Sequence, residues 1–80
     1  MLEAKFKEGD YIINRKSHDM AIVKCLSKKG YYQFKAFYGG MFKEWKDVDA
    51  YELQINYQKF YELCTEEEKK KLDKIIAEQS

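Results

Sequence analysis

Ser17, His18 and Asp19 are the residues whose types come nearest to a nucleophile, a base and an acid for catalysis. A hydrolytic triad needs three such side chains in one line of hydrogen bonds, with the base between the other two. Consecutive residues of a loop point their side chains in different directions, so this triplet cannot readily form that line. The segment therefore indicates a polar turn, and we expect a protein that is not an enzyme.

A metal site would have to draw on His18, Cys25 and Cys64, which lack the short paired spacings of zinc ligands. Gly39 and Gly40 do not form a phosphate-binding loop, because no Lys-Ser or Lys-Thr pair follows them. We therefore expect no metal and no cofactor. The two cysteines are predicted to be buried free thiols rather than partners in a disulfide.

Basic side chains gather in the first half of the chain. Between residues 14 and 43, seven lysines and arginines stand against one acid, although the net charge of the whole chain is only +1. Tyr31 and Phe37 of the same stretch are predicted to face away from the core. Ammonium groups beside exposed rings suit the surface of a protein partner, and they also suit single-stranded nucleic acid, whose bases stack on rings. The predicted contact residues are Lys24, Lys28, Lys29, Tyr31, Lys35 and Phe37.

Two features favour a protein partner over nucleic acid, although the nucleic-acid alternative stays open. Arginine, the better bidentate ligand of phosphates and base edges, occurs once, and the overall charge is near neutral. A plain solvated lysine face is the third alternative. Separately, the aromatic residues Tyr57, Phe60 and Tyr61 either dock on the chain's own barrel or seal a homodimer, so we expect a monomer or a homodimer.

Short strands are predicted to carry the contact residues. The segments 10–14, 20–27, 31–38, 41–48 and 50–55 are rich in β-branched and aromatic residues and are separated by tight polar turns. Five short strands suit a small, strongly bent barrel. Strict alternation within residues 31–38 puts Tyr31 and Phe37 on the outer face and the following residues on the inner one: Tyr32, Phe34, Ala36 and Tyr38. In the strand before it, alternation groups Ala21, Val23 and Cys25 on one face.

Helical spacing begins after residue 56. A first short helix would carry aromatic and sulfur side chains on one face, at Tyr57, Phe60, Tyr61 and Cys64. Thr65 and Glu68 form a capping box at the start of a second helix. That helix has a narrow apolar stripe formed by Leu72, Ile75 and Ile76.

The fold predicted from these elements is mostly β with a C-terminal α part. A five-stranded barrel would occupy residues 1–55, and one or two short helices in residues 56–80 would pack on it as part of a single compact domain. Because the strands are apolar on both faces, the helical segment is expected to cover part of the outside of the barrel.

The opening segment FKEGDYII, at residues 6–13, resembles the start of SH3-like small barrels of the KOW and Tudor kind. In these barrels a buried aromatic leads in, a Gly-Asp pair makes the turn and an alternating strand follows. The later segments AIVKCL, GYYQFKAF, GGMFKEW and DAYELQ are similar to those of small barrel proteins of gut bacteria and their phages. The segment SHDMAIV departs from a KOW segment, which would carry a glycine there, so ribosome-type RNA contacts do not carry over. The resemblance implies the SH3-like fold and a binding role, with no catalytic residues to transfer.

The expected location is the cytoplasm. The N-terminus is charged from Glu3, so no signal peptide is expected, and no apolar run has the length of a membrane span. The sequence thus predicts a small non-enzymatic binding module without membrane contact. Its composition and resemblance suggest an accessory protein of a phage or mobile element that contacts a host protein.

Overall fold

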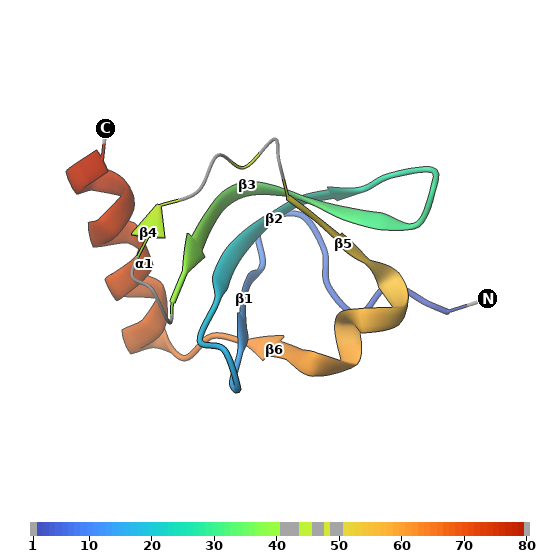
Figure 1. Ribbon diagram of the computed structural model, residues 1–80, viewed down its shortest axis with the longest axis horizontal. Coiled ribbons are helices and arrows are strands. Elements are labelled where there is room, and N and C mark those ends of the chain that lie inside the picture. The colour runs from blue at the N-terminus through green and yellow to red at the C-terminus, as the bar shows by residue number, and fades with distance from the viewer. Residues whose placement is uncertain (1, 41–43, 46–47, 49–50, 80) are drawn as a thin grey trace.

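The computed structural model describes residues 2–40, 44–45, 48 and 51–79 of the chain. Short strands fill the first three quarters of these residues, and a single α-helix closes them (Figure 1). The elements are, in chain order, β1 (Tyr11–Asn14), β2 (Met20–Leu26), β3 (Tyr31–Gly39), β4 (Glu44–Trp45), β5 (Glu52–Gln54), the 3-10 helix η2 (Ile55–Phe60), β6 (Tyr61–Leu63) and α1 (Glu66–Gln79). The prediction of a mostly β protein with a C-terminal helix is confirmed.

The strands form one curled antiparallel sheet, which has the shape of a half-barrel (Figure 1). Its order is β4-β3-β2-β1-β6, and β5 pairs with the other end of β3. The predicted strand over 41–48 is represented by Glu44–Trp45, and its residues 41–43, 46 and 47 lie outside the described residues. The curled sheet fits the small-barrel prediction in its coarse form.

A short helix is found at the segment predicted to be helical from Tyr57, but its predicted continuation to Cys64 is wrong. The chain instead makes the 3-10 helix η2 and then extends as β6, which pairs with β1 through Ile12 and Leu63. The sheet therefore continues past residue 55, where the sequence placed the end of the barrel. The edge of β1 has backbone N–H and C=O groups that need hydrogen-bond partners. Pairing them with β6 stabilises the chain more than one short helix would, because short helices are marginally stable.

Two apolar clusters lie on opposite faces of the sheet. The inner cluster consists of Phe6, Ile12, Ala21, Val23, Tyr32, Phe34 and Phe37. The outer cluster joins the sheet to α1 and consists of Ile13, Met20, Ile22, Ala36, Cys64 and Leu72. Leu72 is fully enclosed, and Ile75 and Ile76 pack against the same cluster. The strands are apolar on both faces because one face fills the barrel and the other receives the helix.

Two bulges shift the side-chain alternation of the β2–β3 hairpin. Ile22 pairs with Ala36 and Val23 pairs with Phe34, so Lys35 of β3 has no partner. The next pair is Cys25 with Gln33, so Lys24 of β2 has no partner either. Each bulge adds one residue to one strand and turns the side chains beyond it to the other face. Because the two bulges lie on facing strands, they cancel in register and leave the hairpin paired to its tip.

None of the helices in the described part of the chain combines the length and the apolar character needed to cross a membrane.

Candidate functional site

The predicted contact lysines lie on the β2–β3 hairpin, and two of them occupy its bulges. Lys24 and Lys35 are the residues that the pairing omits, and both side chains are exposed. A bulge re-aims the side chain of its extra residue, here outward from the sheet. The Lys35 ammonium lies 4.0 Å from the carboxylate of Glu8, and an exposed pair of this kind contributes little to stability.

Lys28 and Lys29 lie at the tip of the same hairpin. The turn is held by hydrogen bonds from the Gly30 N–H to the Ser27 carbonyl at 3.0 Å and from the Ser27 N–H to the Tyr31 carbonyl at 2.7 Å. Gly30 has a φ of 81°, a left-handed conformation that glycine adopts without a Cβ penalty. The backbone is therefore fixed while both lysine side chains are exposed.

Tyr31 is only partly available to a ligand. Its side chain is half-buried, and its hydroxyl accepts a hydrogen bond from the Gln54 side-chain amide at 2.8 Å. Tyr31 and Gln54 also face each other across the β3–β5 pair. The ring therefore lies beside β5 and is only partly open to a ligand.

The prediction that Phe37 is a surface contact is wrong. Its side chain is 7% exposed and belongs to the inner cluster. The ring stacks on Tyr51 with centroids 4.7 Å apart and on Phe34 with centroids 5.9 Å apart. The bulge at Lys35 is the cause, because it moves Phe37 to the inner face and Ala36 to the outer one.

The same shift on β2 affects the cysteines. Cys25 is exposed and Cys64 is buried, and both are free thiols. The prediction of burial is therefore wrong for Cys25, which lies just beyond the bulge at Lys24. Burial and the neighbouring Glu68 carboxylate raise the pKa of Cys64 to about 11, so this thiol is a poor nucleophile.

Ser17, His18 and Asp19 shape the loop between β1 and β2. The Ser17 hydroxyl accepts a hydrogen bond from the Asp19 N–H at 3.4 Å, and the Asp19 carboxylate accepts one from the Gly40 N–H at 3.2 Å. His18 has a φ of 64°, an uncommon value for a residue with a Cβ. The Ser17 and Asp19 side chains thus bind backbone N–H groups of the loop and of Gly40. This explains both residues as parts of a turn.

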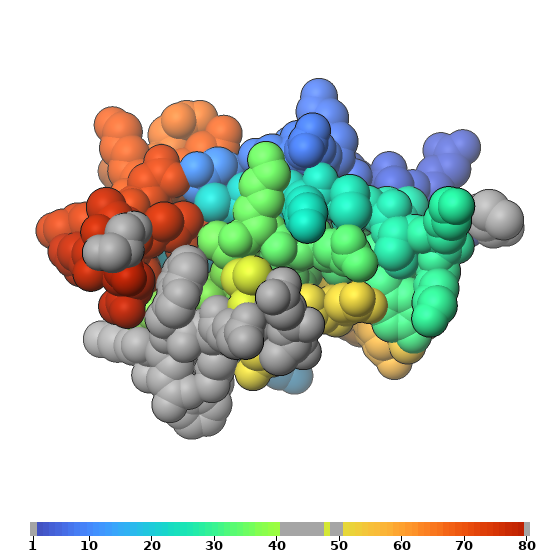
Figure 2. Space-filling model, turned by 90° about the horizontal axis from the view of Figure 1, so that it is seen from above, coloured from blue at the N-terminus to red at the C-terminus, as the bar shows by residue number. Residues whose placement is uncertain are grey.

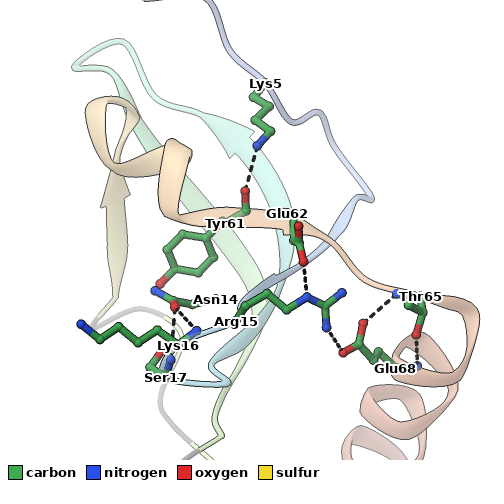
Figure 3. Close-up of polar contacts among 9 residues, drawn as sticks. All are labelled: Lys5, Asn14, Arg15, Lys16, Ser17, Tyr61, Glu62, Thr65 and Glu68. Carbon is green, nitrogen blue, oxygen red and sulfur yellow. Dashed lines mark hydrogen bonds and ion pairs between the residues drawn. The ribbon is translucent and has the colours of Figure 1, made fainter.

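The single arginine does not belong to the basic hairpin surface. Arg15 bridges β6 and α1, because its guanidinium forms ion pairs with Glu62 and with Glu68 (Figure 3). Glu68 also completes the predicted capping box: its carboxylate accepts from the Thr65 N–H at 2.8 Å, and its own N–H donates to the Thr65 hydroxyl at 3.2 Å. The hydrogen bond from Arg15 lowers the pKa of Glu68. This network holds the start of α1 to the sheet.

A pair of exposed rings lies on η2. Tyr57 and Phe60 stack with centroids 6.2 Å apart, and the ammonium of Lys59 lies 5.3 Å from the centre of the Phe60 ring. The sequence grouped these rings with Tyr61, but Tyr61 is on β6 and packs against the inner cluster. Within the described part of the chain, Tyr57 and Phe60 are thus not found docked on the sheet. The contribution of Lys59 to this site was missed, because a single lysine between aromatics carries no spacing signal.

No protein-family model, curated protein or solved structure matches the chain. Function is therefore inferred from geometry and charge. The features available for recognition are the exposed lysines of a well-paired hairpin and the stacked pair of exposed rings on η2.

Proposed function

We propose that the protein is a non-enzymatic binding module of the SH3-like small-barrel class, which binds an acidic surface of a protein partner through its β2–β3 hairpin. The fold assignment is supported by the order of the sheet, in which the last strand returns to pair with the first. It is also supported by the segment at residues 6–13. There Phe6 is buried in the inner cluster, and Gly9, with a φ of 88°, turns the chain into β1.

The observation that carries the proposal is the unneutralised charge of the hairpin. Lys24, Lys28 and Lys29 are exposed and form no ion pair with any residue that the structure describes. Lys35 adds a fourth ammonium whose only described pairing is the long exposed one with Glu8. Positive charge concentrated on one rigid element raises the local potential and steers an acidic partner to it.

Two observations favour a protein over single-stranded nucleic acid at this surface. Stacking of bases requires open ring faces, but the Phe37 ring is enclosed and the Tyr31 ring is half-buried. Arg15 is committed to Glu62 and Glu68.

Affinity capture with the tagged protein tests the proposal, using lysate of the cell that produces it, with and without nuclease. A specific protein should be retained after nuclease treatment. The double charge reversal Lys28→Glu/Lys29→Glu should reduce its recovery by about tenfold, because two attractive contacts become repulsive.

The matched control is Lys70→Glu/Lys74→Glu on α1, where both lysines are exposed and form no ion pair with any described residue. Recovery with this control should equal that of the wild type. Equal losses with both double variants, or retention that disappears with nuclease, would refute the hairpin as a protein-binding surface.

A further inference from the structure

Tyr57 and Phe60 are an exposed aromatic pair that the fold does not need for its own packing. Their side chains are 47% and 56% exposed, and none of the residues of η2 is buried. Large stacked rings in water lose the free energy that burial would provide, about 25 cal/mol per Å² of apolar surface. An exposed pair of this size points to a contact with another molecule.

The two rings are held in place by a network around Gln58. The Gln58 side chain accepts a hydrogen bond from the Lys5 N–H at 2.8 Å and donates one to the Glu3 carbonyl at 2.8 Å. It also accepts from the hydroxyl of Tyr32, which is fully buried in the inner cluster. The helix that presents the rings is thus tied to the N-terminal segment and to the core. Preorganisation of this kind lowers the entropy cost of binding.

The helix that carries the ring pair begins beside the hairpin tip. The Ile55 N–H donates to the Gly30 carbonyl at 2.9 Å, so the start of η2 is bonded to the turn. A shallow groove runs between them and is lined by Lys29, Gly30, Tyr31, Gln54, Ile55 and Asn56. In Figures 1 and 2 the hairpin tip and the segment leading into η2 lie at the same end of the molecule. Asn56, at the end of this groove, immediately precedes Tyr57.

Basic side chains lie beside both the groove and the rings. Lys28 and Lys29 are at the hairpin end, and Lys59 is beside the rings. The residues described as lining the groove include no carboxylate. The surface therefore complements an acidic ligand that also carries an apolar side chain.

We propose that the groove and the Tyr57–Phe60 pair bind an acidic, extended peptide segment of a protein partner. An aromatic or aliphatic side chain of the peptide contacts the ring pair, and its carboxylates contact Lys28, Lys29 and Lys59. This inference rests on the proposed function and extends its binding surface from the hairpin to η2. A peptide is favoured over single-stranded nucleic acid because the single arginine, the better ligand of phosphates, is paired with Glu62 and Glu68. Oligothymidine is therefore the competitor in the test below.

A library of short random peptides displayed on phage, selected against the immobilised protein, tests the inference. Enriched peptides should combine several Asp or Glu residues with one Trp, Tyr, Phe or Leu. Binding of an enriched peptide, measured by fluorescence anisotropy, should weaken by about tenfold or more in Phe60→Ala and in Tyr57→Ala, as expected for aromatic anchors at an interface. Leu63→Ala, a control at a side chain that is 57% exposed outside the groove, should stay within about twofold of the wild type.

The two proposals fail in different ways. If Lys28→Glu/Lys29→Glu abolishes binding and both ring variants bind normally, the extension to η2 is refuted and the hairpin function stands. If only the ring variants lose binding, the hairpin function fails. Enriched peptides without acids, displacement of the peptide by oligothymidine, or self-association through the rings on a dilution series would each overturn the peptide inference. Circular dichroism should show unchanged folding in the ring variants, because both side chains are exposed.

Discussion

Phe37→Ala distinguishes the observed hairpin from a strictly alternating one. The structure encloses the Phe37 ring between Phe34 and Tyr51 on the inner face, whereas strict alternation would put it on the outer face as a contact residue. Truncation of a buried phenylalanine costs about 3–5 kcal/mol through lost burial and a residual cavity. Tyr51 is 37% exposed and can move toward the cavity, so we expect a loss of free energy of unfolding near the lower limit, about 3 kcal/mol.

Urea denaturation followed by tryptophan or tyrosine fluorescence measures this loss. A domain of 80 residues has a free energy of unfolding of about 4–12 kcal/mol, so the variant should still fold. With a slope of about 1–1.5 kcal/mol/M, the midpoint should fall by about 2–3 M. Phe60→Ala makes the same chemical change at an exposed site and should cost less than about 0.5 kcal/mol. A loss below about 1 kcal/mol in Phe37→Ala would refute the bulge at Lys35 and return this ring to the surface.

Three further outcomes are expected. Gly40→Ala should cost about 2 kcal/mol in the same assay, because a Cβ at Gly40 would overlap the carbonyl oxygen of His18; a neutral result would contradict that close approach. The pKa of Glu68 is lowered below its ordinary value of 4.5, so its contribution to stability is present above that pH and is lost as the pH falls through the lowered pKa; Glu68→Gln should remove this part of the acid dependence of thermal unfolding. Iodoacetamide labelling of the native protein at neutral pH, read by mass spectrometry, should modify Cys25 and spare Cys64, and equal labelling would disprove the burial of Cys64.

Local signals in the sequence predict the turns and the helix start well. Gly30 takes the positive φ that a tight hairpin turn requires, and Phe6 is the buried aromatic that leads into β1. Thr65 and Glu68 form the reciprocal hydrogen bonds of a capping box. Each of these features depends on a few neighbouring residues, so their types suffice to predict it.

Features that depend on partners distant in the chain are not predictable in this way. A bulge inserts one residue without any characteristic residue type. Lys24 and Lys35 therefore do not show that Cys25 and Phe37 lie on the faces opposite to those that strict alternation predicts. Similarly, Tyr61 fits helical spacing but lies on a strand, because β6 pairs with the edge of β1 that does not pair with β2. The hairpin lysines of the predicted site are exposed, as the sequence indicates. The partial burial of Tyr31 and the burial of Phe37, its two aromatic residues, could be seen only in the tertiary structure.

The hairpin presents exposed lysines while the Phe37 ring is enclosed and the Tyr31 ring is half-buried, and we propose that it recognises an acidic protein rather than nucleic acid. The most direct measurement is the affinity of the protein for fluorescent oligothymidine as a function of salt concentration. We predict binding too weak to saturate at about 1 mM at physiological salt, with a shallow salt dependence. Saturable binding whose log–log slope against salt is near −3, the value expected for about four lysine–phosphate contacts, would contradict the claim.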